Sequence, residues 1–224
     1  TEIVEAVNQV LGQRITKRAD LQLSVVDEMD FPNYIRQRVN YFVDDWTRVS
    51  AWMFIPRQSE DAPGILCCHQ ACKQGKDEPA GLAGNGRMAF AAHYAELGYI
   101  TIAPDSVTAG ERISSKSEAF NTSLFYKDHP KASLLGKMLD DHLHALDVLE
   151  ADRRVDSARI GVIGHGLGGT NALMLAATDG RVQCCVASCG FTRFSTDPQV
   201  SRWASEGGMN LIPRLREGIE SGVF

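Results

Sequence analysis

Short hydrophobic runs alternate with segments of helical periodicity from about residue 34 onward. This alternation is typical of βα repeats, in which parallel strands form a sheet and helices cover it. The hydrophobic runs predict strands at residues 64–69, 99–104, 159–163 and 182–187. The periodic segments predict helices at residues 87–97, 131–151, 168–177 and 209–219.

The N-terminal part of the chain has a different pattern. Its first thirty residues predict an amphipathic lead-in, because Ile3, Val7, Val10 and Leu11 lie at helical spacing. Residues 34–43 and 48–56 then alternate between apolar and polar positions on either side of Asp44 and Asp45. These two segments predict a pair of antiparallel strands joined by a short turn. We therefore expect a mixed, mostly parallel sheet that is antiparallel at its N-terminal edge.

The polar stretch at residues 105–131 has no clear periodicity and is long for a connection inside a compact domain. We expect it to form either a helix-poor excursion or a flap near a site. No linker-like change of composition divides the chain, and 224 residues are an ordinary size for one domain. Residues 1–224 are therefore expected to form a single domain.

Composition excludes several classes of function. The chain is 44% hydrophobic and 23% charged, with 23 Lys and Arg against 28 Asp and Glu, and it has no basic stretch. A nucleic-acid partner is therefore not expected. No apolar run reaches the roughly 18 residues that a membrane helix needs, and no signal for export precedes residue 11. No membrane partner is expected either.

The six cysteines form two clusters of identical spacing, Cys67-Cys68-x3-Cys72 and Cys184-Cys185-x3-Cys189. Thiolates in groups can hold zinc, but zinc ligands usually lie on turns, whereas both doublets lie inside apolar runs. Free cysteine packs as a small hydrophobic residue. We therefore expect core thiols, no metal site and a reducing, cytoplasmic environment.

The sequence G-H-G-L-G-G at residues 164–169 follows a predicted strand and opens a predicted helix. Gly164, Gly166 and Gly169 fit the dinucleotide fingerprint G-x-G-x-x-G, in which glycines let the backbone approach a pyrophosphate. That fingerprint also needs an acidic residue about 20 positions later, to bind the ribose. Residues 187–190 read A-S-C-G and supply none. An NAD(P)-binding protein is therefore the least favoured interpretation.

The same residues fit the nucleophile elbow G-x-S-x-G at every position except the third. Gly166 occupies the nucleophile position, and glycine has no oxygen that could attack an acyl carbon. Histidine 165 is expected to be a packed neighbour of the elbow, and Ser188 is not expected to replace the nucleophile. The charged residues at 76–78 and 111–112 either line the mouth of a site or form a solvated loop.

Several separated motifs, taken in order, resemble the α/β-hydrolase superfamily, most closely its dienelactone-hydrolase-like and acetyl-xylan-esterase-like branch. They are L-C-C-H-Q at residues 66–70, G-K-D-E-P-A-G-L-A-G at 75–84, A-P-D at 103–105, G-E-R at 110–112 and the elbow. The resemblance implies a three-layer α/β fold. It also implies serine-type hydrolysis of carboxylic esters, such as acetyl esters on carbohydrates, with no metal and no organic cofactor.

The resemblance assigns roles only where residues match. A nucleophilic Ser would stand where this chain has Gly166. The oxyanion hole would use the backbone N–H of Leu167 together with that of Gln70 or Ala71. These donors belong to the main chain, so they survive changes of side chain.

The chain also departs from the family pattern. The acid and the histidine of the family follow later strands, which are expected to lie beyond Phe224 and to be missing from this chain. None of the six histidines follows the elbow, and only Asp197 could be the acid by position. The strand at residues 182–187 is then expected to be an exposed edge or to pair with another copy, as in a homo-oligomer. We therefore predict an ester hydrolase by ancestry that is inactive or impaired, or alternatively a non-catalytic protein that binds a small ester.

Overall fold

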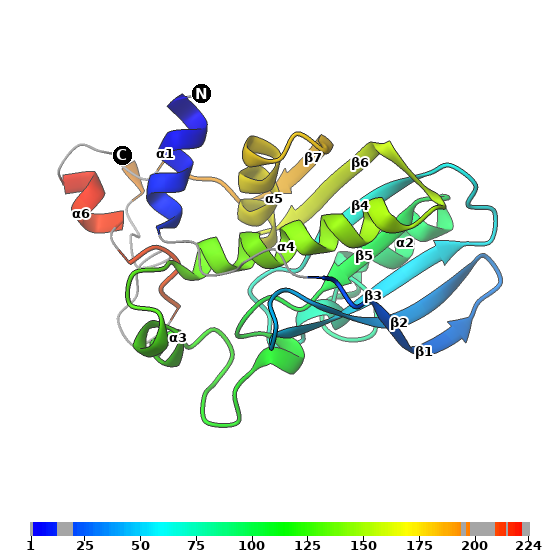
Figure 1. The fold of residues 1–224 in the computed structure, drawn as a ribbon, viewed down its shortest axis with the longest axis horizontal. Coiled ribbons are helices and arrows are strands. Elements are labelled where there is room, and N and C mark those ends of the chain that lie inside the picture. The colour runs from blue at the N-terminus through cyan, green and yellow to red at the C-terminus, as the bar shows by residue number, and fades with distance from the viewer. Residues whose placement is uncertain (1, 13–19, 194–195, 198–208, 214, 221–224) are drawn as a thin grey trace.

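The computed structural model describes residues 2–12, 20–193, 196–197, 209–213 and 215–220. The described strands form one seven-stranded sheet in the order β1-β2-β3-β5-β4-β6-β7 (Figure 1). They are β1 (Ser24–Asp30), β2 (Tyr34–Phe42), β3 (Arg48–Pro56), β4 (Ala62–Cys68), β5 (Ile100–Pro104), β6 (Val155–His165) and β7 (Val182–Ser188). The α-helices are α1 (Glu2–Leu11), α2 (Phe90–Glu96), α3 (Ser123–Asp128), α4 (Leu134–Ala151), α5 (Leu167–Thr178) and α6 (Leu215–Glu220).

The sheet is mixed in the expected way. Strands β1, β2, β3 and β5 are antiparallel neighbours, whereas β5, β4, β6 and β7 run parallel. The antiparallel N-terminal edge is therefore confirmed. Strand β1 was not expected, because residues 24–30 fall inside the predicted lead-in. All seven of its residues are exposed, so the strand is held by backbone pairing with β2 and not by burial.

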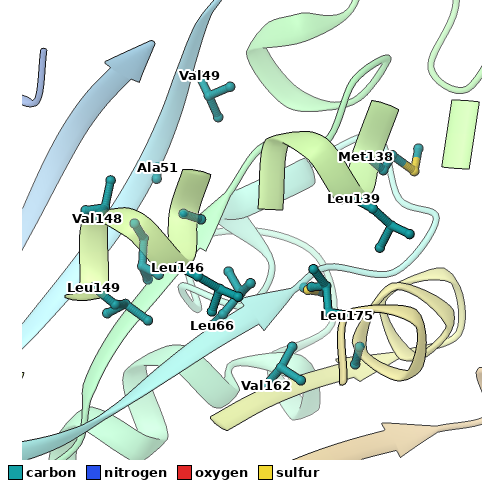
Figure 2. Close-up of a cluster of buried hydrophobic side chains, with 14 of the residues drawn as sticks. Val49, Ala51, Leu66, Met138, Leu139, Leu146, Val148, Leu149, Val162 and Leu175 are labelled. Carbon is teal, nitrogen blue, oxygen red and sulfur yellow. The ribbon is translucent and has the colours of Figure 1, made fainter. Parts of the chain in front are cut away.

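The alternation of side chains along β4 assigns the helices to two opposite faces of the sheet. Leu66 and Cys68 point into the core that α4 and α5 cover, whereas Cys67 belongs to a smaller cluster beneath α2. Figure 2 shows the larger core, where Leu66 and Val162 of the sheet lie near leucines of α4 and α5. Helix, sheet and helix thus form the three layers that the sequence predicts.

Strand β7 is the edge strand at the end of the sheet opposite β1, as expected for residues 182–187. Helix α5 packs against it, yet most of its side chains remain exposed. A groove of about 380 Å³, lined by Tyr94, Tyr99, Cys184 and Val186, lies beside it. The expectation of core thiols is therefore correct for Cys67 and Cys68 and wrong for the exposed Cys184 and Cys189. The two clusters share a spacing, but only β4 is covered on both faces.

Two other expectations need correction. The predicted helix at residues 209–219 is much shorter, because α6 begins at Leu215. The polar stretch 105–131 contains a 3₁₀ turn at Gly110–Arg112 and helix α3, and its first residues, Asp105 and Ser106, are buried. At least this first part is packed into the protein. Among the described residues, no helix is both long and apolar enough to cross a membrane.

Helix α4 carries an unusual buried histidine. His142 is fully buried, and neither of its ring nitrogens has a hydrogen-bond partner among the described residues. Burial lowers the pKa of His142 to about 3, because the nearby Asp141 carboxylate offsets the loss of hydration only in part. The imidazole is therefore neutral in the folded protein at pH 7.

We expect His142→Leu to flatten the loss of stability on acidification. The folded ring stays neutral down to about pH 3, whereas in the unfolded chain it takes up a proton near pH 6.5. The contribution of His142 to the free energy of unfolding is therefore fully present above pH 6.5. It decreases as the pH falls below 6.5, by about 2 kcal/mol at about pH 5. The measurement is the urea unfolding of both proteins at about pH 7.5 and about pH 5. Equal losses in the two proteins would contradict the prediction.

Candidate active site

The order of the strands locates a crevice in the sheet. Strand β4 lies between β5 and β6, so the chain leaves β4 in one direction for β5 and then crosses to the other side for β6. In parallel α/β sheets, ligands bind beyond the carboxyl ends of the strands at such a switch point. Gln70 follows the end of β4 and Gly166 follows the end of β6. Two of the predicted site residues therefore flank this crevice.

Gly166 has the strained backbone of an elbow. It joins β6 to α5 with φ 54° and ψ −119°, a conformation that side chains rarely adopt. A Cβ atom added to Gly164 would lie 2.2 Å from the carbonyl carbon of Gly168, and one added to Gly168 would lie 2.1 Å from the oxygen of Cys68. Among the described residues, a Cβ atom at Gly166 would have only the Cβ of Gln70 within 4 Å, at 3.8 Å. The flanking positions therefore require glycine, whereas position 166 has room for a side chain.

A cavity of about 260 Å³ opens at this turn, and we call it the elbow cavity. Its walls include Ala71, Gly166, Leu167, Cys189, Phe191 and Met209. Leu167 is the first residue of α5, and N–H groups in the first turn of a helix have no acceptor within the helix. The positive end of the helix dipole also faces the cavity. Three of the four predicted site residues thus lie together, and Gln70 borders them.

The loop that carries Gln70 and Ala71 is fixed by a buried carboxylate. Asp105 accepts hydrogen bonds from the backbone N–H of Lys76 at 2.8 Å, from Nζ of Lys76 at 2.8 Å and from the backbone N–H of Glu111 at 3.0 Å. Burial disfavours the charged Lys76 ammonium, but Asp105 and Glu111 together raise the pKa of Lys76 above its usual value. Lys76 therefore remains charged, and Lys76 and Glu78 are buried rather than part of a solvated loop.

Glycine is needed on both sides of this carboxylate. A Cβ atom added to Gly75 would lie 2.1 Å from Oδ1 of Asp105, and one added to Gly110 would lie 1.9 Å from the same oxygen. Both glycines have φ +55°. The loop after β4 and the loop after β5 are thus wrapped around one side chain. The sequence alone did not indicate this role of Asp105.

A second tie between these loops comes from His69. Its Nε2 accepts a hydrogen bond from the backbone N–H of Ser106 at 3.0 Å, so Nδ1 carries the proton and donates to the oxygen of Gln70 at 2.7 Å. Burial lowers the pKa of His69, which agrees with a neutral ring. His69 therefore positions the predicted oxyanion loop, a role that the sequence motif L-C-C-H-Q did not reveal.

Two further groups that the sequence brought into consideration are Asp197 and His165. Asp197 is buried and is not among the residues that line the elbow cavity. Nδ1 of His165 lies 2.9 Å from Oγ of Ser188. Among the described residues, no group of three or more His, Cys, Asp or Glu could hold a metal ion.

Comparisons with known proteins agree with the fold. A family model described as the dienelactone hydrolase family matches residues 49–206 of the chain. YtaP of Bacillus subtilis (strain 168), which is named as a hydrolase, is 35% identical over 101 residues, which are 45% of this chain and 32% of YtaP.

Solved structures show the same fold. A protein of Bacteroides fragilis NCTC 9343 described as an acetyl xylan esterase aligns with TM-score 0.69 and 19% identity over 81% of this chain and 50% of its own. The acetyl xylan esterase from Paenibacillus sp. R4 aligns with TM-score 0.57 and 20% identity. A glucuronoyl esterase from Solibacter usitatus aligns with TM-score 0.60 and 19% identity. Each of these two alignments covers 81% of this chain and 55% of the other chain. The expected α/β-hydrolase fold is confirmed. The chain spans a third of YtaP and about half of these structures.

The fit of Asp105 between two glycines gives a test of the loop. We expect Gly110→Ala to lower the free energy of unfolding by about 2 kcal/mol or more, because the new Cβ displaces the buried carboxylate and the φ is unfavourable. The control is Gly180→Ala, at a position where a Cβ atom meets nothing within 4 Å. Urea unfolding measures both variants. Equal losses would contradict the role given to Asp105.

Proposed function

The chain belongs to the dienelactone hydrolase family, and on that premise we propose that its elbow cavity binds small carboxylic esters in a hydrolase frame from which the nucleophile has been removed. The observation that carries this proposal is the backbone at Gly166. It has an elbow conformation, room for a side chain and two flanking glycines that the packing requires. These features support a site shaped for a nucleophile at position 166 that now holds glycine.

The binding chemistry of the site comes from the main chain. The N–H of Leu167, together with that of Gln70 or Ala71, would donate to the carbonyl oxygen of an ester, and the helix dipole of α5 would stabilise negative charge there. The volume of about 260 Å³ lies below the range of about 300 Å³ and more that is usual for drug-sized ligands, which favours a small acyl group. The acetyl group in the descriptions of two structural relatives is an example of a small acyl group.

Glycine at position 166 changes what the site does with an ester. A serine hydrolase forms its acyl-enzyme on the hydroxyl oxygen of the elbow, and that step has no acceptor atom at Gly166. We therefore infer that an ester is bound and polarised at the elbow without being transferred to residue 166. A dinucleotide is a weaker candidate, because Ser188 and Cys189 stand where a ribose-binding carboxylate is needed after β7.

Gly166→Cys tests the proposed oxyanion donors. A thiol at the start of a helix supplies its own nucleophile near neutral pH and needs a general base less than serine does. We expect p-nitrophenyl acetate to acetylate Cys at position 166 roughly 10- to 100-fold faster than an exposed thiol, which is the size of effect expected from such donors. The acyl group should then remain on the sulfur.

Gly180→Cys is the matched control. Position 180 is open to solvent, and no native cysteine lies between residues 160 and 181, where both substitutions are made. Mass spectrometry of the peptide that contains these residues measures acetylation in both variants. Equal acetylation rates at positions 166 and 180 would refute the proposed function.

A further inference from the structure

Three reactive side chains meet where β6 and β7 end, beside the elbow. Nδ1 of His165 lies 2.9 Å from Oγ of Ser188. The Ser188 hydroxyl in turn donates a hydrogen bond to Sγ of Cys189, at 3.9 Å between the oxygen and the sulfur. We call these residues the 165–188–189 cluster. The elbow chemistry described above uses none of their side chains.

Cys189 follows the end of β7 and differs by its position from Cys184, the exposed cysteine on that strand. It lines the elbow cavity together with Ala71, Gly166 and Leu167. Cys184 lines the groove beside β7 instead. One thiol of the chain therefore shares a cavity with the proposed oxyanion donors.

The backbone on both sides of Cys189 is attached to the start of α5. The N–H of Gly166 donates to the oxygen of Ser188 at 2.8 Å, and Oγ1 of Thr170 donates to the oxygen of Gly190 at 2.8 Å. A Cβ atom at Gly190 would lie 2.2 Å from the carbonyl carbon of Gly169, so the two segments touch. Cys189 is thus held at a fixed place relative to the helix N-terminus.

The hydrogen bonds of the cluster orient the sulfur. If Nδ1 of His165 donates to Oγ of Ser188, the Ser188 hydroxyl is free to donate to Sγ of Cys189. A donor aimed at the sulfur fixes the direction of the Cys189 side chain relative to the cavity. His165 and Ser188 therefore act as positioning residues for Cys189.

We propose that Cys189 is an acyl acceptor in the elbow cavity and takes small acyl groups from activated esters or thioesters. Its thiolate attacks the carbonyl carbon, the oxygen is held by the oxyanion donors, and a new S–C bond forms as the bond to the leaving alkoxide or thiolate breaks. The thiol proton passes to solvent before attack, and the leaving group takes a proton from solvent. The product is an S-acyl thioester on Cys189. This inference rests on the proposed function, since it uses the same oxyanion donors.

The wild-type protein carries its own control. Cys184 and Cys189 are both exposed and lie on one short stretch, so fragmentation of a single peptide by mass spectrometry locates an acetyl group on either. With p-nitrophenyl acetate we expect Cys189 to be acetylated at least about tenfold faster than Cys184. Iodoacetamide alkylates a thiol without attack on a carbonyl carbon, so the oxyanion donors do not assist its reaction. Its preference for Cys189 over Cys184 should therefore be several-fold smaller. Equal preferences with the two reagents would overturn the proposal.

Ser188→Ala tests the positioning role through the contrast between the two reagents. Removing the hydroxyl should lower the preference for Cys189 over Cys184 several-fold with p-nitrophenyl acetate, because the sulfur is no longer oriented toward a carbonyl held by the oxyanion donors, and should leave the preference with iodoacetamide unchanged. Equal falls with both reagents would overturn this part of the proposal.

The two proposals fail in distinguishable ways. Fast acetylation at position 166 of Gly166→Cys, with no preference for Cys189 in the wild type, would refute the acyl-acceptor role and leave the ester site standing. Slow acetylation at both positions would refute both proposals.

Discussion

The buried carboxylate of Asp105 is the constraint on which the loops around the site depend. A carboxylate removed from water must be hydrogen-bonded and paired, because leaving one partner of a buried ion pair alone costs about 3–5 kcal/mol. Here the donors are the backbone of two loops and the ammonium of Lys76, which lies 29 residues earlier in the chain. The chain therefore cannot bury Asp105 without bringing the loop after β4 against the loop after β5. Glycine at positions 75 and 110 is the steric consequence of that approach.

The same network extends into the core and explains why α4 carries charge. Arg112, which follows the loop held by Asp105, donates to the buried Asp141 of α4. Burial would raise the pKa of Asp141, but Arg112 and Lys137 lower it below its usual value, so the carboxylate stays ionised. His142 is the next residue on the helix and lies in this same interior, where its ring nitrogens have no hydrogen-bond partner in the part of the chain that the structure describes. Loops at the ends of the strands are thereby connected through charges to the helix that covers the larger core.

Local patterns predicted the elements that bury a face, and failed where burial depends on distant neighbours. The hydrophobic run at β4 and the periodicity of α4 identified both elements, and the glycines at 164–168 identified the elbow, because each signal lies within a few residues. Strand β1 was missed since its side chains are all exposed and only pairing with β2 defines it. The prediction of core thiols was wrong for the exposed residues of the second cysteine cluster, because the spacing of cysteines does not indicate whether a strand is covered on both faces. The role of Asp105 depends on partners brought together by the sheet order, which the loop sequence does not show.

The division of labour between main chain and side chains explains how the proposed ester site could persist without a nucleophile at position 166. The strained turn, the helix dipole and the N–H donors at Leu167 are properties of the backbone, and the flanking glycines that shape them are required by packing at Gly164 and Gly168. The proposed replacement of serine by glycine at position 166 removes a hydroxymethyl group, and the loss of its Cβ relaxes an unfavourable φ, so the frame has no physical reason to collapse. What the change does remove is the group that would take up the acyl carbon. The proposed stabilisation of an oxyanion would then be available to any nucleophile that reaches the same cavity, and Cys189, which follows the end of β7, lines that cavity.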